Sequence, residues 1–193
     1  MLNPSLSVND APPAGRRRGR WQLLALLAIV IGPMVLASAM YQWRFWVPET
    51  RTYHGDLIGD GTTRADLGVE AEEKRWQLLV TAPGDCAQEC RQLVYLARQI
   101  QIGLNRETAR ATHALAVGTP LAEDYEATLQ REYPQLGRYL LDLPRYRGQV
   151  AEDAPLLWIV DPLGNLVLRY DAGSSGRDIL KDLQLLLKLS RIG

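Results

Sequence analysis

Cysteine and histidine are scarce in this chain, which contains only two of each among its 193 residues. The cysteines are Cys86 and Cys90, and the histidines are His54 and His113. Neither histidine stands at a recognisable metal-binding spacing from the cysteines, which excludes the familiar zinc motifs. We expect His54 to lie in a solvated loop, from which it could swing toward the cysteines, and His113 to be a hydrogen-bonded residue of a strand.

Charge of one sign is not in excess either, because 22 basic residues balance 22 acidic ones. Residues 1–43 hold four arginines and one aspartate, so residues 44–193 carry a net charge of about −3. A nucleic-acid-binding domain needs a basic face, and nucleic acid is therefore excluded as a partner. The sequence also has no Ser/His/Asp set, phosphate-binding glycine loop, paired-carboxylate pattern or internal repeat.

Charged residues are missing altogether from residues 21–43, a run of 23 residues. A helix of that length is about 34 Å long, enough to cross a hydrocarbon core of roughly 30 Å. Four arginines between residues 16 and 20 precede the run, and Arg44 is the only close cation after it. The positive-inside rule therefore predicts a bacterial inner-membrane protein with one transmembrane helix, a cytoplasmic N-terminus and a periplasmic C-terminal domain.

A cleaved signal peptide is the alternative for this run, because Ala37-Ser38-Ala39 resembles a cleavage site. Both interpretations export the same domain and differ only in the tether. No cysteine follows the run closely, so a lipoprotein anchor is not expected.

The chain divides into a cytoplasmic tail (1–20), a transmembrane helix (21–43), a linker and lead-in segment (44–72) and a globular domain (73–193). Within the domain, sequence patterns predict strands at 74–81, 109–117, 155–160 and 166–170, and helices at 86–104, 119–132 and 175–192, while 135–144 stays undecided. Strands that alternate with helices indicate a parallel sheet, to which the last two strands add an antiparallel hairpin. The fold class is therefore α/β, a thioredoxin-like domain with a single N-terminal transmembrane helix.

The two cysteines directly follow the first strand and stand at the start of the first helix. Asp85 fits the N-cap position, with Gln88 three residues on as in a capping box, and Cys86 is then the first helical residue. The positive end of a helix favours a thiolate at that place. Cys90 follows one turn later on the same face, at a Cα distance of about 6 Å that suits a disulfide or two thiolates on one Cu(I) ion.

Three roles remain open for the pair at this point. Cys86 and Cys90 can exchange disulfides, with Cys86 as the attacking thiolate and Cys90 as the resolving thiol, or bind copper, or form a plain structural bridge. A bridge over so few residues closes too short a loop to stabilise a whole domain much, which favours a functional pair.

Over residues 70–193 the chain resembles the Sco/SenC family of membrane-anchored, thioredoxin-fold proteins. The resemblance rests on the N-terminal anchor, on a strand followed by Cys86-x-x-x-Cys90, and on the hairpin segment 158–165. It implies an accessory protein of cytochrome c oxidase assembly that acts by thiol–disulfide exchange, with copper delivery as a further role. The implied partner is a respiratory oxidase subunit or another exported thiol protein, and the implied ligand is copper at Cys86 and Cys90.

The chain departs from the family pattern in two places. The family usually has proline after each cysteine, where this chain has Ala87 and Arg91. The third copper ligand in the family is a histidine, and the matching position in this chain is Asp153. Because a carboxylate is a poor ligand for Cu(I), the sequence favours redox chemistry and names no certain cofactor. Pro155 is either a cis-proline facing the cysteines, as in thioredoxin-like enzymes, or a residue that merely starts a strand.

Two other functions stay open. The protein is a general membrane-tethered thiol–disulfide oxidoreductase if the pair acts on many substrates. It is a non-catalytic docking protein if the cysteines form only a structural bridge.

Overall fold

The computed structural model describes residues 16–43 and 53–190, and the chain divides into two compact units near residue 50. The first unit contains helix α1 (Arg16–Trp43), which confirms the helix expected over residues 21–43. Its Arg20–Ala39 segment is long and apolar enough to cross a membrane, and its large apolar side chains are exposed. The expected tail (1–20) overlaps this helix at residues 16–20, whereas tail residues 1–15 and linker residues 44–52 lie outside the described residues.

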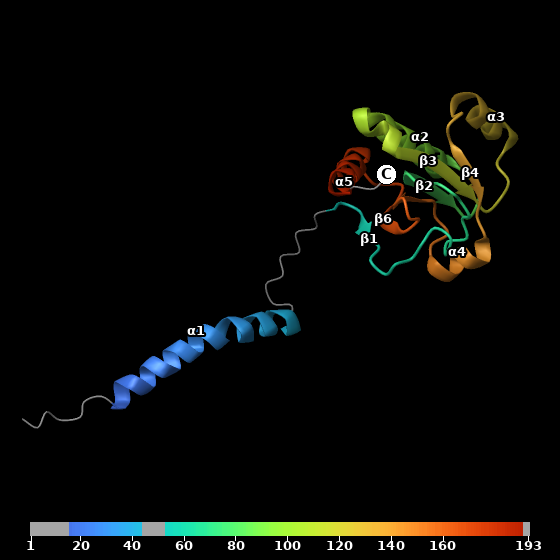
Figure 1. The fold of residues 1–193 in the computed structure, drawn as a ribbon. Helices are drawn as coiled ribbons and strands as arrows, with labels where there is room; N and C mark the ends of the chain where they lie inside the picture. The colour runs from blue at the N-terminus through green and yellow to red at the C-terminus, as the bar shows by residue number, and fades with distance from the viewer. Residues whose placement is uncertain (1–15, 44–52, 191–193) are drawn as a thin grey trace, which may run out of the picture. The chain divides into compact units, whose positions relative to one another are not determined.

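The second unit is built on a six-stranded mixed sheet (Figure 1). The strands are β1 (Asp56–Leu57), β2 (Trp76–Ala82), β3 (Ala111–Val117), β4 (Gly137–Leu140), β5 (Leu156–Val160) and β6 (Leu166–Tyr170), in the order β1-β6-β5-β2-β3-β4. Strands β2, β3 and β4 pair in parallel, whereas β2–β5, β5–β6 and β6–β1 pair antiparallel. The predicted parallel sheet with an added antiparallel hairpin is confirmed.

Helices cover both faces of this sheet. They are α2 (Gln88–Gly103), a 3₁₀ helix η1 (Asn105–Arg110), α3 (Glu123–Glu132), α4 (Leu143–Gln149) and α5 (Gly176–Leu189). Figure 1 shows α2 and α5 side by side over one face, with α4 at the other. Two separate apolar cores result, one beneath α2 and α5 and one beneath α4.

Strand β2 lies in the middle of the sheet, and all seven of its residues are buried. Its side chains alternate, so that Leu78 and Val80 enter the core beneath α2 and α5 while Leu79 enters the core beneath α4. Each of these three side chains stabilises the fold by roughly 1.5–3 kcal/mol. Strand β2 therefore ends at a rigid point, Ala82, from which the loop that carries Cys86 departs.

Several predicted ends differ from the structure. Residues 109–110, expected in a strand, belong to η1, and β3 begins at Ala111. The start of α2 is described with the cysteines below, and the other two predicted helices differ as follows. Helix α3 begins at Glu123 rather than Thr119, because Ala122 is its N-cap and the Thr119 hydroxyl is turned toward the Asp85 carboxylate, to which it donates at 3.4 Å. Helix α5 ends at Leu189, and the last expected helical residue, Ile192, lies outside the described residues.

The undecided segment 135–144 forms strand β4 and the start of helix α4. The side chain of Asp142 caps α4 by accepting the Arg145 N–H, and Pro144 occupies its first turn. The lead-in segment is partly ordered as well. Its residues 56–57 form β1, and Leu67 and Val69 are fully buried in the core beneath α4.

A buried carboxylate fastens the start of the second unit to α5. Asp182 is only 2% exposed and accepts hydrogen bonds from the His54 N–H (2.7 Å), the His54 ring Nδ1 (2.8 Å), the Gly55 N–H (3.2 Å) and the Tyr170 hydroxyl (2.7 Å). Burial, and then the bond to Asp182, raise the pKa of Tyr170, so its hydroxyl stays protonated and donates. His54 is half-exposed, as expected for a loop residue, but its ring is bound to Asp182.

We predict that Asp182→Ala destabilises the domain by about 2–4 kcal/mol, because the substitution leaves the buried Tyr170 hydroxyl and three partly buried donors of residues 54–55 without an acceptor. The matched control is Asp178→Ala, one turn earlier on the same helix, where the carboxylate pairs with Lys181 at 3.1 Å and is partly exposed. That change should cost about 1 kcal/mol or less. Urea unfolding of the full chain in detergent measures both, and equal losses for the two variants would contradict this account of Asp182.

Candidate functional site

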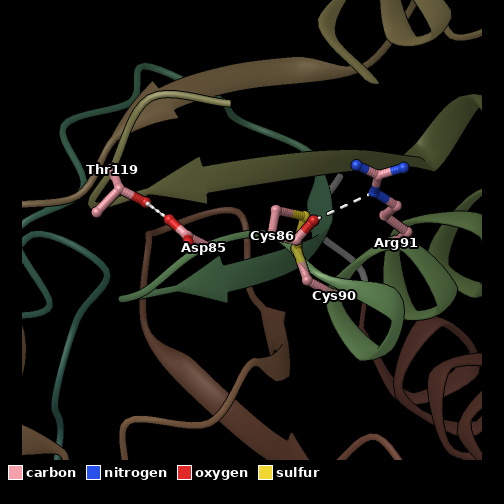
Figure 2. Close-up of a disulfide and its surroundings, with 5 residues drawn as sticks. All are labelled: Asp85, Cys86, Cys90, Arg91 and Thr119. Carbon is pink, nitrogen blue, oxygen red and sulfur yellow. Dashed lines mark hydrogen bonds between the residues drawn. A yellow bond between two sulfur atoms is a disulfide. The ribbon is translucent and has the colours of Figure 1, made fainter. Parts of the chain in front are cut away.

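Cys86 and Cys90 are joined by a disulfide, with a Cα–Cα distance of 5.0 Å (Figure 2). Cys86 lies in the loop between β2 and α2, and Cys90 lies in the first turn of α2. The predicted strand–turn–helix setting is therefore confirmed, and the two sulfur atoms meet where β2 ends and α2 begins.

The predicted N-cap is wrong. Helix α2 begins at Gln88 with Ala87 as its N-cap, so Cys86 precedes the helix instead of opening it. The Ala87 N–H donates to the Asp85 backbone carbonyl at 2.8 Å, which makes a tight turn before the helix starts. The Asp85 carboxylate accepts from Thr119 and caps nothing. The uncapped first turn still begins between the two cysteines, so its positive end lies next to both in the chain.

The two cysteines differ in burial by a small margin. Cys86 is 9% exposed and Cys90 is 1% exposed, and both belong to the core beneath α2 and α5. Cys86 is therefore the less buried of the two, and its role as the attacking cysteine, with Cys90 as the resolving one, stays a prediction.

A second loop, after β3, supports the cysteine loop from the side. The Gly118 N–H donates to the Ala82 carbonyl at 2.9 Å, and a Cβ atom at Gly118 would lie only 2.7 Å from the Pro83 carbonyl oxygen. Glycine is therefore required where the two loops touch. The hydrogen bond from Thr119 to Asp85 joins the same two loops (Figure 2).

Arg91, the residue after Cys90, reaches back to the cysteine loop. Its Nε donates to the Cys86 carbonyl oxygen at 3.2 Å, as Figure 2 shows. Its guanidinium carbon lies 4.4 Å from the centre of the Tyr125 ring, and its Nη1 lies 3.5 Å from the Asp124 carboxylate. Three contacts thus fix a cation beside the disulfide, although the sequence marked Arg91 only as a departure from the family pattern.

The residues around the pair do not fit a three-ligand copper site. Asp153, which stands at the family's histidine position, is exposed and pairs with Arg147 at 3.3 Å. His54 is bound to Asp182, and His113 is buried in the sheet. Within residues 16–43 and 53–190 no group of three His, Cys, Asp or Glu side chains is arranged to hold a metal ion.

The peptide bond between Ala154 and Pro155 is trans, so the cis-proline interpretation is wrong. Pro155 instead directly precedes β5, whose Leu156 pairs with Thr81 of β2. Proline is tolerated here because it starts the strand and does not have to donate within the ladder.

His113 packs between the sheet and α2. The Gln101 amide nitrogen donates to the Ala111 carbonyl at 2.7 Å, so its amide oxygen faces the ring and accepts from the His113 Nδ1–H. The ring's Nε2 is buried and has no partner among the described residues. Burial, reinforced by the positive charge of Arg98, lowers the pKa of His113 to about 4. His113 is therefore a neutral residue of the core, as expected for a strand histidine.

We predict that His113 makes the domain less stable in mild acid. The unfolded state takes up a proton near pH 6.5, whereas the folded state takes it up only near pH 4. Stability is therefore full above pH 6.5 and falls as the pH drops toward 4, by about 2 kcal/mol between pH 7 and pH 5. His113→Phe should remove this part of the pH dependence. Urea unfolding at the two pH values measures it, and an unchanged pH dependence in the variant would refute the assignment.

Comparison with protein families identifies the chain. The model described as "Transmembrane-like, thioredoxin-like, C-terminal domain" matches residues 76–190, and the model described as "Transmembrane-like, N-terminal domain" matches residues 13–44. The first match covers more than half of the chain. The chain therefore belongs to the family of transmembrane-like, thioredoxin-like proteins, which confirms the expected fold class.

Sco proteins are among the similar solved structures. Copper-bound ScoI of Arabidopsis thaliana is 9% identical with a TM-score of 0.48, covering 61% of this chain and 87% of that protein. Copper-bound yeast Sco1 is 10% identical with a TM-score of 0.48, covering 62% and 82%. A thiol peroxidase from Chromobacterium violaceum is 13% identical with a TM-score of 0.45, covering 70% and 91%. A search of curated proteins found no match.

Proposed function

We propose that this protein is a membrane-anchored thiol–disulfide exchange protein that assists the assembly of a copper-containing respiratory oxidase. The observation that supports this most directly is the disulfide at the start of α2, in which Cys86 lies in the loop before the helix and is less buried than Cys90. The arginines that precede the apolar part of α1 support a cytoplasmic N-terminus and a periplasmic domain in a bacterial inner membrane.

The exchange runs through Cys86. In the reduced protein the Cys86 thiolate attacks a disulfide of the partner, one partner sulfur leaves as a thiolate, and a mixed disulfide forms. Cys90 then loses its proton and attacks the Cys86 sulfur, which restores the Cys86–Cys90 bond and releases the second partner thiolate. The partner gains two electrons and ends as a dithiol, and a second exported dithiol protein reduces the pair again.

A reduced partner is what copper insertion needs, because thiolates are the ligands that bind Cu(I). An oxidase subunit with a cysteine-containing copper site is therefore the partner that we propose. Copper would be cargo for this protein, and Cys86 and Cys90 are the only cysteines that could carry it. Since the described site offers no third ligand, we assign the exchange, and not copper carriage, as the main activity.

The full chain with Cys90→Ser tests this function, with Cys86→Ser as the matched control. Cys90→Ser should accumulate a mixed disulfide with the oxidase subunit in membranes, because the resolving thiol is gone, whereas Cys86→Ser should accumulate none. In a deletion strain neither variant should restore the copper and haem spectrum of the oxidase.

The two alternative functions, a general oxidoreductase and a docking protein, predict different outcomes of this experiment. Mixed disulfides with many exported proteins, at normal oxidase levels, would indicate a general oxidoreductase. Full restoration by the variant that lacks both cysteines would indicate a docking protein. A normal oxidase spectrum in the deletion strain itself would end the assembly hypothesis.

A further inference from the structure

Arg91 makes a second link between the two segments that the disulfide joins. The disulfide connects the cysteine loop to the first turn of α2 through the two sulfur atoms. The bond from the Arg91 Nε to the Cys86 carbonyl connects the same loop to the same turn, without involving either sulfur. Reduction breaks the first link, whereas the second does not depend on the bond between the sulfurs.

Two residues of α3 hold the Arg91 guanidinium in position. The Tyr125 ring, which is 7% exposed, lies beneath the guanidinium, and the Asp124 carboxylate lies at its edge. A cation over an aromatic face is attracted by the electron density of the ring, and more strongly when it is shielded from water. The side chain is thus held in one orientation before any partner binds.

The charge of Arg91 also matters to a thiolate at Cys86. Asp85 and Glu89 are the neighbours of Cys86 and Cys90 in the chain, and Asp124 faces Arg91 from α3. A negative charge disfavours a thiolate near it, and a positive charge favours one. Arg91 donates to the carbonyl of Cys86 itself, so this cation is held on the residue that would carry the thiolate.

We infer that Arg91 is a positioning residue for disulfide exchange, which holds the Cys86 loop against α2 in the reduced protein and offsets the surrounding negative charge on the Cys86 thiolate. The inference rests on the proposed function and deepens it. It also gives a physical role to a position where the Sco/SenC pattern has proline, since proline has no side chain that can reach the loop.

The test measures the reactivity of Cys86 in the reduced full chain. The chain carries Cys90→Ser, so that Cys86 is the only thiol that reacts. The rate of alkylation by iodoacetamide is followed from pH 5 to pH 9. Arg91→Gln should lower the rate at pH 6.5 by about three- to tenfold and move the whole profile to higher pH, because fewer molecules carry the thiolate. Arg91→Lys should recover part of the rate, since it restores the charge but not the planar fork.

Two further variants separate this effect from a loss of structure. Arg98→Gln is the matched control, because Arg98 lies on the same helix with its guanidinium 4.8 Å from the Tyr133 ring centre, and it should leave the profile unchanged. Glu89→Gln removes an exposed carboxylate next to Cys90 without touching the contacts of Arg91, and it should raise the rate at pH 6.5, the opposite direction.

A profile for Arg91→Gln that matches the unsubstituted protein would overturn the inference, as would an equal loss in Arg98→Gln or a fall in rate for Glu89→Gln. The readout needs no partner protein. If the pH profiles shift as expected while Cys90→Ser traps no oxidase subunit, the proposed function fails and the role of Arg91 stands.

Discussion

The burial of β2 on both faces is the constraint on which the rest of this structure depends. Its seven buried residues pair with β3 on one edge and with β5 on the other, and they supply side chains to both cores. The strand cannot shift without exposing apolar residues on one face or the other. Its end at Ala82 is therefore fixed, and so are the cysteine loop and the Gly118 contact that continue from it.

Much of this fold could be predicted because long apolar runs signal their own structure. The strands at 76–82 and 156–160 are buried on both faces and consist almost entirely of apolar residues. Strand β4 gave no such signal, because its four residues alternate only between exposed and half-exposed. The start of α2 was misplaced for a local reason: Asp85 has the right side chain for a cap, but a backbone turn and Thr119 engage it.

The site itself was only partly predictable. The cysteine pair is visible in the sequence, since it follows a strand and precedes a helix. The roles of Arg91 and Asp182 depend on residues far away in the chain, Tyr125 for one and His54 for the other. The sequence does contain a signal for Asp182, because this residue interrupts the apolar face of α5 beside Ile179 and Leu183. A lone carboxylate on such a face indicates a buried acceptor, but not which donors meet it.

Mapping of the sulfur that exchanges with glutathione tests the central claim most directly. The oxidised full chain in detergent is incubated with reduced glutathione, quenched with acid, and analysed by mass spectrometry. The account predicts a reversible adduct on Cys86 with Cys90 released as a free thiol, because Cys86 lies in the loop before α2 and is the less buried of the two cysteines. An adduct on Cys90, or a bridge that never opens in a buffer that reduces exposed disulfides, would contradict it.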